Sequence, residues 1–196
     1  FSGNPFKAFC REHTNDASII TSGGCNDEYN FKKLLTETSN VIIDAGAHIG
    51  GETLALATNP NNIIYSIEAL KSNYDVLIKN IELNNFKNII PIHRALSNTN
   101  NIKIKIYFSP TPLHQYIANT TDDPKNPNYQ EVTTIDLNTL FMSYNINKCS
   151  LLKMDIEGNE DVILQSCSIN NLSKIQCIVG EHHRVNRDVV FNIVKN

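Results

Sequence analysis

The sequence contains no apolar run of about 18 residues, the length that a membrane-spanning helix needs. It also has no excess of basic residues, since 17 lysines and arginines stand against 20 aspartates and glutamates, for a net charge of -3. A nucleic-acid backbone usually calls for a basic face on its protein partner. These two absences predict a protein without a membrane span and without nucleic acid as its main partner.

The cysteines contain no C-x-x-C pair, which is the spacing typical of zinc and redox sites. They are odd in number, namely Cys10, Cys25, Cys149, Cys167 and Cys177. Free thiols are the ordinary state in a reducing compartment. We therefore predict no metal site and a cytoplasmic location.

A chain of 196 residues suffices for one domain with a proper core and is short for two. Residues 1–40 show no strong periodicity, so we predict an N-terminal extension packed on a domain spanning residues 41–196. Within the extension, Ser22-Gly23-Gly24 indicates a loop, and residues 28–38 have the composition of a short helix.

Predicted strands and helices alternate from residue 41 onward. Strands are expected at 41–44, 63–68 and 89–96, with helices at 52–58 and 73–84 between them. This β-α-β-α-β order is typical of a parallel sheet with right-handed crossovers. We predict an α/β, Rossmann-like fold with a mainly parallel central sheet and helices on both faces.

The second half continues the pattern around one long irregular segment. Strands are expected at 102–108, 132–137, 151–156 and 175–180, and helices at 138–144, 160–165 and 188–194. Residues 109–130 hold four prolines and no periodicity. A loop of this length in a compact domain is often functional or else disordered, so we expect it to cover or select the substrate.

A glycine-rich turn, residues 44–51, follows the first strand directly and precedes a helix. Ligands of open α/β sheets bind beyond the carboxyl ends of the strands, where glycines let the backbone approach closely. Gly46, Gly50 and Gly51 do not match the G-x-G-x-x-G register of dinucleotide sites. Asp44 would repel a pyrophosphate but attract the cationic groups of S-adenosylmethionine (SAM). The turn favours SAM, with an ordinary tight turn as the alternative.

An acidic residue, Glu68, ends the second predicted strand 24 residues after Asp44. A carboxylate at about this distance from a glycine turn is placed to hold ribose hydroxyls, and it can accept from two at once. Taken alone, Glu68 would be a solvated residue at a strand end. Together with the turn, it indicates a ribose site.

Further carboxylates follow the strand at 151–156. Asp155 and Glu157 are candidates to orient a substrate hydroxyl or amine, or to accept its proton. We assign Glu160 to stabilising the next helix through its dipole. The last predicted strand leads into Glu181-His182-His183, where His183 is a candidate base or substrate contact. Neighbouring residues leaving a strand point to opposite faces, so this triplet does not predict a metal site.

Taken together, these segments resemble the FkbM family of class I SAM-dependent methyltransferases over roughly residues 40–185. The glycine turn alone is typical of the whole superfamily, whereas Asp155-Ile156-Glu157-Gly158 and Thr134-Ile135-Asp136 are more specific to the family. The other matching segments are 41–50, 67–68, 77–85, 95–97, 152–160 and 179–183.

The resemblance implies SAM as methyl donor and O-methylation of a small molecule bearing a hydroxyl, such as a sugar or a lipid-like compound. It places Asp44, Gly46 and Gly50 at the methionine part, with Ala47 in the same turn, and Glu68 at the ribose. It makes Ala69, Ala95 and Leu96 neighbours of the adenine. Asp155, Glu157 or His183 would then act as the base.

Two departures from the family pattern and one absent motif bear on these expectations. Ala69-Leu70 stands where the family usually has Pro-Asn, and the final antiparallel hairpin of the fold is not evident before Asn196. The Asn-Pro-Pro-Tyr segment of many N-methyltransferases is absent, which favours a different acceptor. The alternatives are a non-catalytic SAM-binding module, a nicotinamide-dependent oxidoreductase and an RNA methyltransferase.

Overall fold

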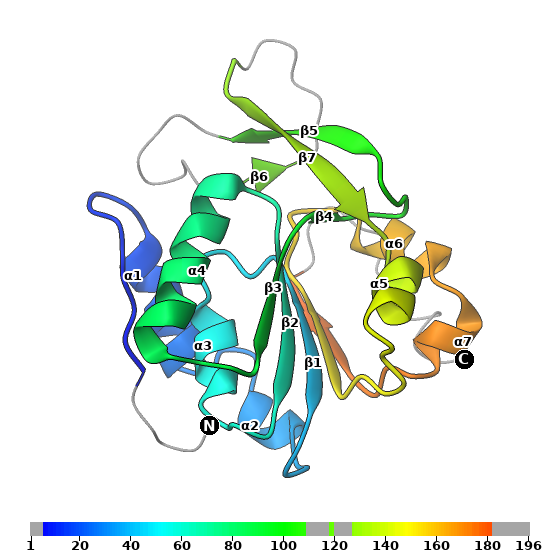
Figure 1. The fold of residues 1–196 in the computed structure, drawn as a ribbon, viewed down its shortest axis with the longest axis horizontal. Coiled ribbons are helices and arrows are strands. Elements are labelled where there is room, and N and C mark those ends of the chain that lie inside the picture. The colour runs from blue at the N-terminus through cyan, green and yellow to red at the C-terminus, as the bar shows by residue number, and fades with distance from the viewer. Residues whose placement is uncertain (1–5, 109–117, 120–126, 182–196) are drawn as a thin grey trace.

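The computed structural model describes residues 6–108, 118–119 and 127–181, and Figure 1 shows its arrangement. At its centre is a five-stranded sheet in the order β3-β2-β1-β8-β9, in which every neighbouring pair is parallel. Its strands are β1 (Val41–Ala45), β2 (Ile63–Glu68), β3 (Ile89–His93), β8 (Leu151–Met154) and β9 (Ile178–Gly180). Because the strands are parallel, their carboxyl ends meet at one edge, where open α/β sheets bind ligands.

Helices cover both faces of this sheet, with α3 and α4 on one side and α5, α6 and α7 on the other (Figure 1). Ile42 packs with Phe31 and Leu56 on one face, whereas Ile43 packs with Phe141 and Leu164 on the other. Successive strand residues point to opposite faces, so a strand that is apolar throughout must be covered twice. The predicted α/β fold is confirmed. The helices are α3 (Gly51–Ala57), α4 (Lys71–Asn84), α5 (Leu137–Ser143), α6 (Glu160–Ser166) and α7 (Ile169–Leu172).

A second, smaller sheet lies above the carboxyl edge of the central one (Figure 1). It has the order β4-β7-β5-β6, with β4 and β7 parallel and the other pairs antiparallel. The prediction of one strand over 89–96 was wrong, because the Arg94 N–H donates to the Ile92 carbonyl at 3.1 Å and the chain turns there into the second sheet. The strands are β4 (Ala95–Leu96), β5 (Lys103–Phe108), β6 (Ala118–Asn119) and β7 (Tyr129–Ile135).

Residues 16–34 form three short helices: α1 (Asp16–Ile19), the π-helix η1 (Ile20–Cys25) and α2 (Phe31–Leu34). The prediction of a loop at Ser22-Gly23-Gly24 was wrong, since these residues lie inside η1. Their glycines serve close packing instead. A Cβ on Gly24 would lie 2.8 Å from the Gly51 carbonyl oxygen, and one on Gly51 would lie 3.0 Å from that of Ile19. The segment therefore packs backbone to backbone against the start of α3.

Asparagines on α4 bind the backbone of the residues that precede α1. The Asn84 side chain accepts from the Lys7 N–H and donates to the Lys7 carbonyl, both at 2.7 Å. Asn80 pairs with Phe9 in the same way, at 2.6 and 3.3 Å. Each amide satisfies both backbone polar groups of one residue, so residues 7–9 are held along the surface of α4 by hydrogen bonds.

Three expectations from the sequence fall wholly or partly outside the described residues. The helix expected at 188–194 and the question of a final hairpin lie there, as does most of the segment 109–130. Of that segment, the structure describes the two-residue strand β6 and the start of β7 at Tyr129. None of the helices in the described part of the chain is long and apolar enough to cross a membrane.

Candidate functional site

A cavity of about 830 Å³ lies at the carboxyl edge of the central sheet, bounded by the second sheet and by the N-terminal helices. Its volume falls within the range of roughly 300–1,000 Å³ that is usual for small-molecule sites. The predicted site residues that line it are Gly46, Glu68, Ala69, Ala95, Leu96, Asp155 and Glu157. One cavity thus brings together residues from the turn after β1, from β2 and β4, and from the turn after β8.

The glycine turn contacts the cavity through Gly46 and His48, whereas Ala47 and Gly50 do not line it. Gly46 and Gly50 have φ values of +80° and +100°, in the region that favours glycine. A Cβ on Gly46 would also collide with the Asp155 carbonyl oxygen. Glycine at this position therefore lets the ends of β1 and β8 approach each other.

The carboxylate of Asp44 does not line the cavity, in contrast to its expected place beside a cationic ligand. Its Oδ2 accepts from the Thr53 hydroxyl at 2.6 Å, and its Oδ1 lies 3.3 Å from the Lys153 ammonium. Lys153 also donates to the Gly46 carbonyl at 3.0 Å and lies 3.8 Å from Asp155 Oδ2. Asp44 and Lys153 thus form a buried ion pair behind the turn and hold it in place.

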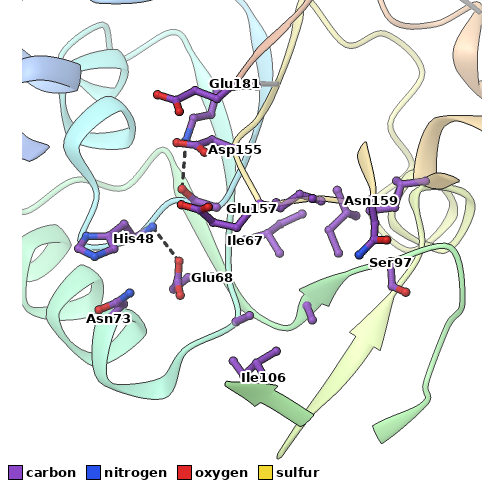
Figure 2. Close-up of a pocket in the computed structure, with 18 of the residues that line it drawn as sticks. His48, Ile67, Glu68, Asn73, Ser97, Ile106, Asp155, Glu157, Asn159 and Glu181 are labelled. Carbon is purple, nitrogen blue, oxygen red and sulfur yellow. Dashed lines mark hydrogen bonds and ion pairs between the residues drawn. The ribbon is translucent and has the colours of Figure 1, made fainter. Parts of the chain in front are cut away.

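The carboxylate of Glu68 is buried at the cavity wall, where it accepts from two backbone N–H groups and from the Asn73 side chain. Figure 2 shows the contact with His48. The His48 N–H donates to Oε2 at 2.8 Å and the Leu70 N–H donates to Oε1 at 2.7 Å. Burial raises the pKa of Glu68 to about 7 in spite of these donors. A carboxylate has about four acceptor positions, so Glu68 can still accept from a ligand.

The raised pKa of Glu68 predicts a pH-dependent contribution to stability. Its pKa rises from an ordinary 4.5 to about 7 on folding, so stability present below pH 4.5 is lost as the pH rises to about 7. One pKa unit corresponds to about 1.4 kcal/mol, which makes the loss about 3 kcal/mol. Free energies of unfolding measured in urea from pH 4.5 to 8 should therefore show the wild type losing about 3 kcal/mol relative to Glu68→Gln, whose side chain does not titrate.

This difference isolates Glu68 from groups that titrate in the same interval. Burial lowers the pKa of His48 to about 4, so His48 loses stability as the pH falls, in the wild type and the variant alike. The substitution itself adds an offset that does not vary with pH. A difference that stays constant across the interval would contradict the prediction.

His48 is a pocket residue that the sequence reasoning did not select. It adopts a φ of +50°, and neither ring nitrogen has a hydrogen-bond partner among the described residues. Histidine and asparagine occupy this backbone region more readily than most residues, which explains its place in the turn. Its low pKa keeps the imidazole neutral, able to donate with one nitrogen and accept with the other.

The turn after β8 carries three consecutive residues with positive φ. Glu157, Gly158 and Asn159 have φ values of +62°, +123° and +72°. Such residues outside glycine cost roughly 1–2 kcal/mol each, and they concentrate at functional sites. Figure 2 shows Asp155 and Glu157 toward the side of His48, with Asn159 toward the side of Ser97. The strained turn thus distributes carboxylates and an amide around the cavity.

Other lining residues come from segments that the sequence reasoning treated as scaffold. Glu52, in the first turn of α3, is a single acidic residue in the otherwise apolar or neutral segment Gly51–Ala57, and that contrast is a signal that could have identified it. Tyr29 carries no comparable signal. His183, a predicted base, lies outside the described residues.

Comparison with known proteins gives one family and several relatives. The model of the FkbM methyltransferase domain matches residues 44–193. The chain is 26% identical over 147 residues to the hexuronic acid methyltransferase AglP of Haloferax volcanii, covering 75% of this chain and 57% of that protein. It therefore spans little more than half the length of this curated relative.

Solved structures give partial matches. TYW2 of M. jannaschii, in complex with AdoMet, is 30% identical over 36% of this chain and 33% of its own, with a TM-score of 0.31. Precorrin-6y C5,15-methyltransferase of Geobacter metallireducens is 11% identical over 100% of this chain and 76% of its own, with a TM-score of 0.49. The family match at residues 44–193 covers most of the sequence, and the chain belongs to the FkbM methyltransferase domain family.

Proposed function

We propose that this protein is a SAM-dependent methyltransferase that methylates a hydroxyl of a sugar-like acceptor, with a uronic acid as the first candidate. The observation that carries the proposal is that one cavity joins Glu68 and the glycine turn to Asp155 and Glu157. Family membership supports methyl transfer, and the name of the relative AglP supports an acidic sugar.

The residues present fit SAM. Glu68 keeps acceptor positions for ribose hydroxyls, and the apolar surfaces of Ala69, Ala95 and Leu96 suit the adenine. The backbone N–H of His48 holds the Glu68 carboxylate at the cavity wall. SAM when bound would supply a methyl group already activated by its sulfonium. The protein then has to align an acceptor with that methyl group and keep water out.

The acceptor would occupy the end of the cavity formed by the turn after β8 and the residues after β4. Asn159, Ser97, Asn98 and Thr99 line this end with amides and hydroxyls that can bind a polyhydroxylated molecule. Arg94, exposed at the same cavity, suits the carboxylate of a uronic acid. Asp155 or Glu157 would accept the proton of the reacting hydroxyl.

The experiment is calorimetric titration with SAM and S-adenosylhomocysteine, followed by transfer of a labelled methyl group to acidic and neutral sugars. We expect micromolar binding of both compounds and label in glycans that contain a uronic acid. Absence of binding by a well-folded sample would contradict the proposal. Binding without transfer to any hydroxyl acceptor would instead favour a SAM-binding module.

Substitution of the two carboxylates should separate catalysis from cofactor binding. A general base contributes roughly 10²–10⁴-fold to rate, so Asp155→Asn or Glu157→Gln should lower kcat at least a hundredfold. The Kd for SAM should stay within about threefold, because neither residue is assigned to the cofactor. Asp161→Asn, on α6 outside the cavity, is the matched control. Full kcat in both variants would remove these residues from the mechanism.

A further inference from the structure

The N-terminal helices form one side of the cavity, although the family match begins only at residue 44. Arg11 fixes them there, since its guanidinium lies 2.8 Å from Asp16 and donates to the Asn73 side chain at 3.0 Å. Asp16 is fully buried beneath this contact. The residues of this segment that face the cavity are Asn15, Ile19, Ser22, Gly23, Glu28 and Tyr29.

Glu52 lies under this segment as a nearly buried carboxylate at the cavity wall, with 8% of its surface exposed. Gly23 covers it so closely that a Cβ there would collide with Glu52 Oε1. In the described part of the chain, the carboxylate accepts a hydrogen bond from its own backbone N–H, and the cation that attracts it is Lys153, which it shares with Asp44 and Asp155. A nearly buried carboxylate that shares its cation with two others is costly, so its place at a cavity indicates a cationic ligand.

The surrounding charges are unbalanced in the same sense. Lys153 interacts with Asp44, Glu52 and Asp155, and Asp44 is the nearest of these. Tyr29, which also lines the cavity, interacts with Asp155, Glu52 and Glu181 as well. One ammonium therefore faces several carboxylates, and Lys153 is already engaged by Asp44 and the Gly46 carbonyl. The region therefore carries an excess of negative charge, which one more cation would balance.

We propose that Glu52, covered by Gly23 and close to Tyr29, binds the ammonium group at the amino-acid end of SAM. This assignment rests on the proposed function. With Glu68 and Ala95 assigned to the adenosine, Gly46 and Glu52, which line the same cavity, are left for the amino-acid end. The N-terminal segment then belongs to the cofactor site because it closes the subsite over this carboxylate.

The test compares three ligands by calorimetry: SAM, S-adenosylhomocysteine and 5′-methylthioadenosine, which lacks the amino-acid end. In Glu52→Gln, the affinity for SAM and for S-adenosylhomocysteine should fall tenfold to a hundredfold, as expected for loss of a charged hydrogen bond. The affinity for 5′-methylthioadenosine should stay within twofold of wild type. Glu12→Gln removes the same charge from an exposed residue of the same segment and should alter the affinity for none of the three ligands.

A second variant displaces the carboxylate while keeping its charge. Gly23→Ala is compatible with the helical backbone, and its Cβ would push the Glu52 side chain aside. It should reproduce the ligand discrimination of Glu52→Gln, and the double variant should lose little more than either single variant. Without ligand, Glu52→Gln should melt no lower than wild type, because it removes a charge that Asp44 and Asp155 repel.

The outcomes separate the two proposals. A wild-type protein that fails to bind SAM would overturn the proposed function and this assignment with it. Wild-type binding with equal losses for all three ligands in Glu52→Gln, or with no loss for SAM, would overturn the assignment alone. A lower melting temperature without ligand, together with equal losses, would identify Glu52 as a structural residue.

Discussion

Replacing Lys153 by methionine is expected to lower the free energy of unfolding by about 3–5 kcal/mol, the usual effect of removing one partner of a buried ion pair. The Lys153 side chain is 2% exposed and lies 3.3 Å from Asp44. Without Lys153, Asp44 and Glu52 would remain buried and would lack the ammonium group that attracts both of them. The glycine turn would also lose the bond from Lys153 to the Gly46 carbonyl.

Urea denaturation of matched variants measures this effect. Lys148→Met breaks the ion pair between Lys148 and Glu37, whose side chains are 50% and 47% exposed, and should have a far smaller effect. Adding Asp44→Asn to Lys153→Met should recover part of the loss, since it removes one uncompensated charge. Equal losses for Lys153→Met and Lys148→Met would show that burial does not govern this pair.

Replacing Glu68 by alanine is expected to weaken SAM binding by a hundredfold or more. Two hydrogen bonds from ribose hydroxyls to a carboxylate, at roughly 1.5–3 kcal/mol each, correspond to at least that factor. The change also removes the acceptor for the His48 and Leu70 N–H groups that shape the cavity wall. Calorimetry with SAM gives the ratio directly.

Glu68→Ala should differ from Glu52→Gln in its ligand profile. It should weaken the binding of 5′-methylthioadenosine as strongly as that of SAM, because both ligands carry the ribose. Glu82→Ala, an exposed change on α4 outside the cavity, provides the control. Undiminished affinity for both ligands in Glu68→Ala would remove Glu68 from the cofactor site.

The central sheet could be predicted because its signal is local. The sequence of β1 is apolar on both faces, and a turn and a short helix follow at once, which fixes a buried parallel strand without knowledge of its neighbours. The parallel order then places Glu68 and Asp155 at one edge. Both line the same cavity, as their positions at strand ends led us to expect.

The partner of Asp44 could not be predicted in this way. A carboxylate at a strand end can face a ligand or the space behind the turn, and the choice depends on which residue pairs with it across the sheet. Asp44 pairs in register with Lys153, and Lys153 neutralises it. The acidic residue that does face the cavity beside the turn is Glu52, and only the folded N-terminal segment makes it a buried group.

The division of residues 89–96 between two sheets was hidden for a similar reason. Both halves are rich in apolar residues, and the chain turns at Arg94 rather than at a glycine or a proline that would have marked the turn. Pro91 does lie within β3, which is the last strand of its sheet in the described residues and therefore tolerates a residue without an N–H. Long-range pairing of β4 with β7 decides where the turn falls.

The asparagine contacts of α4 bear on where an autonomous fragment of this protein can begin. The family likeness begins at residue 44, yet Asn80 and Asn84 bind the backbone of Phe9 and Lys7 through both polar groups of each amide. A fragment cut near residue 40 would expose these amides and open one side of the cavity to solvent. The stretch that matches the family and the stretch that encloses the cavity are therefore different, and the second includes the first helices.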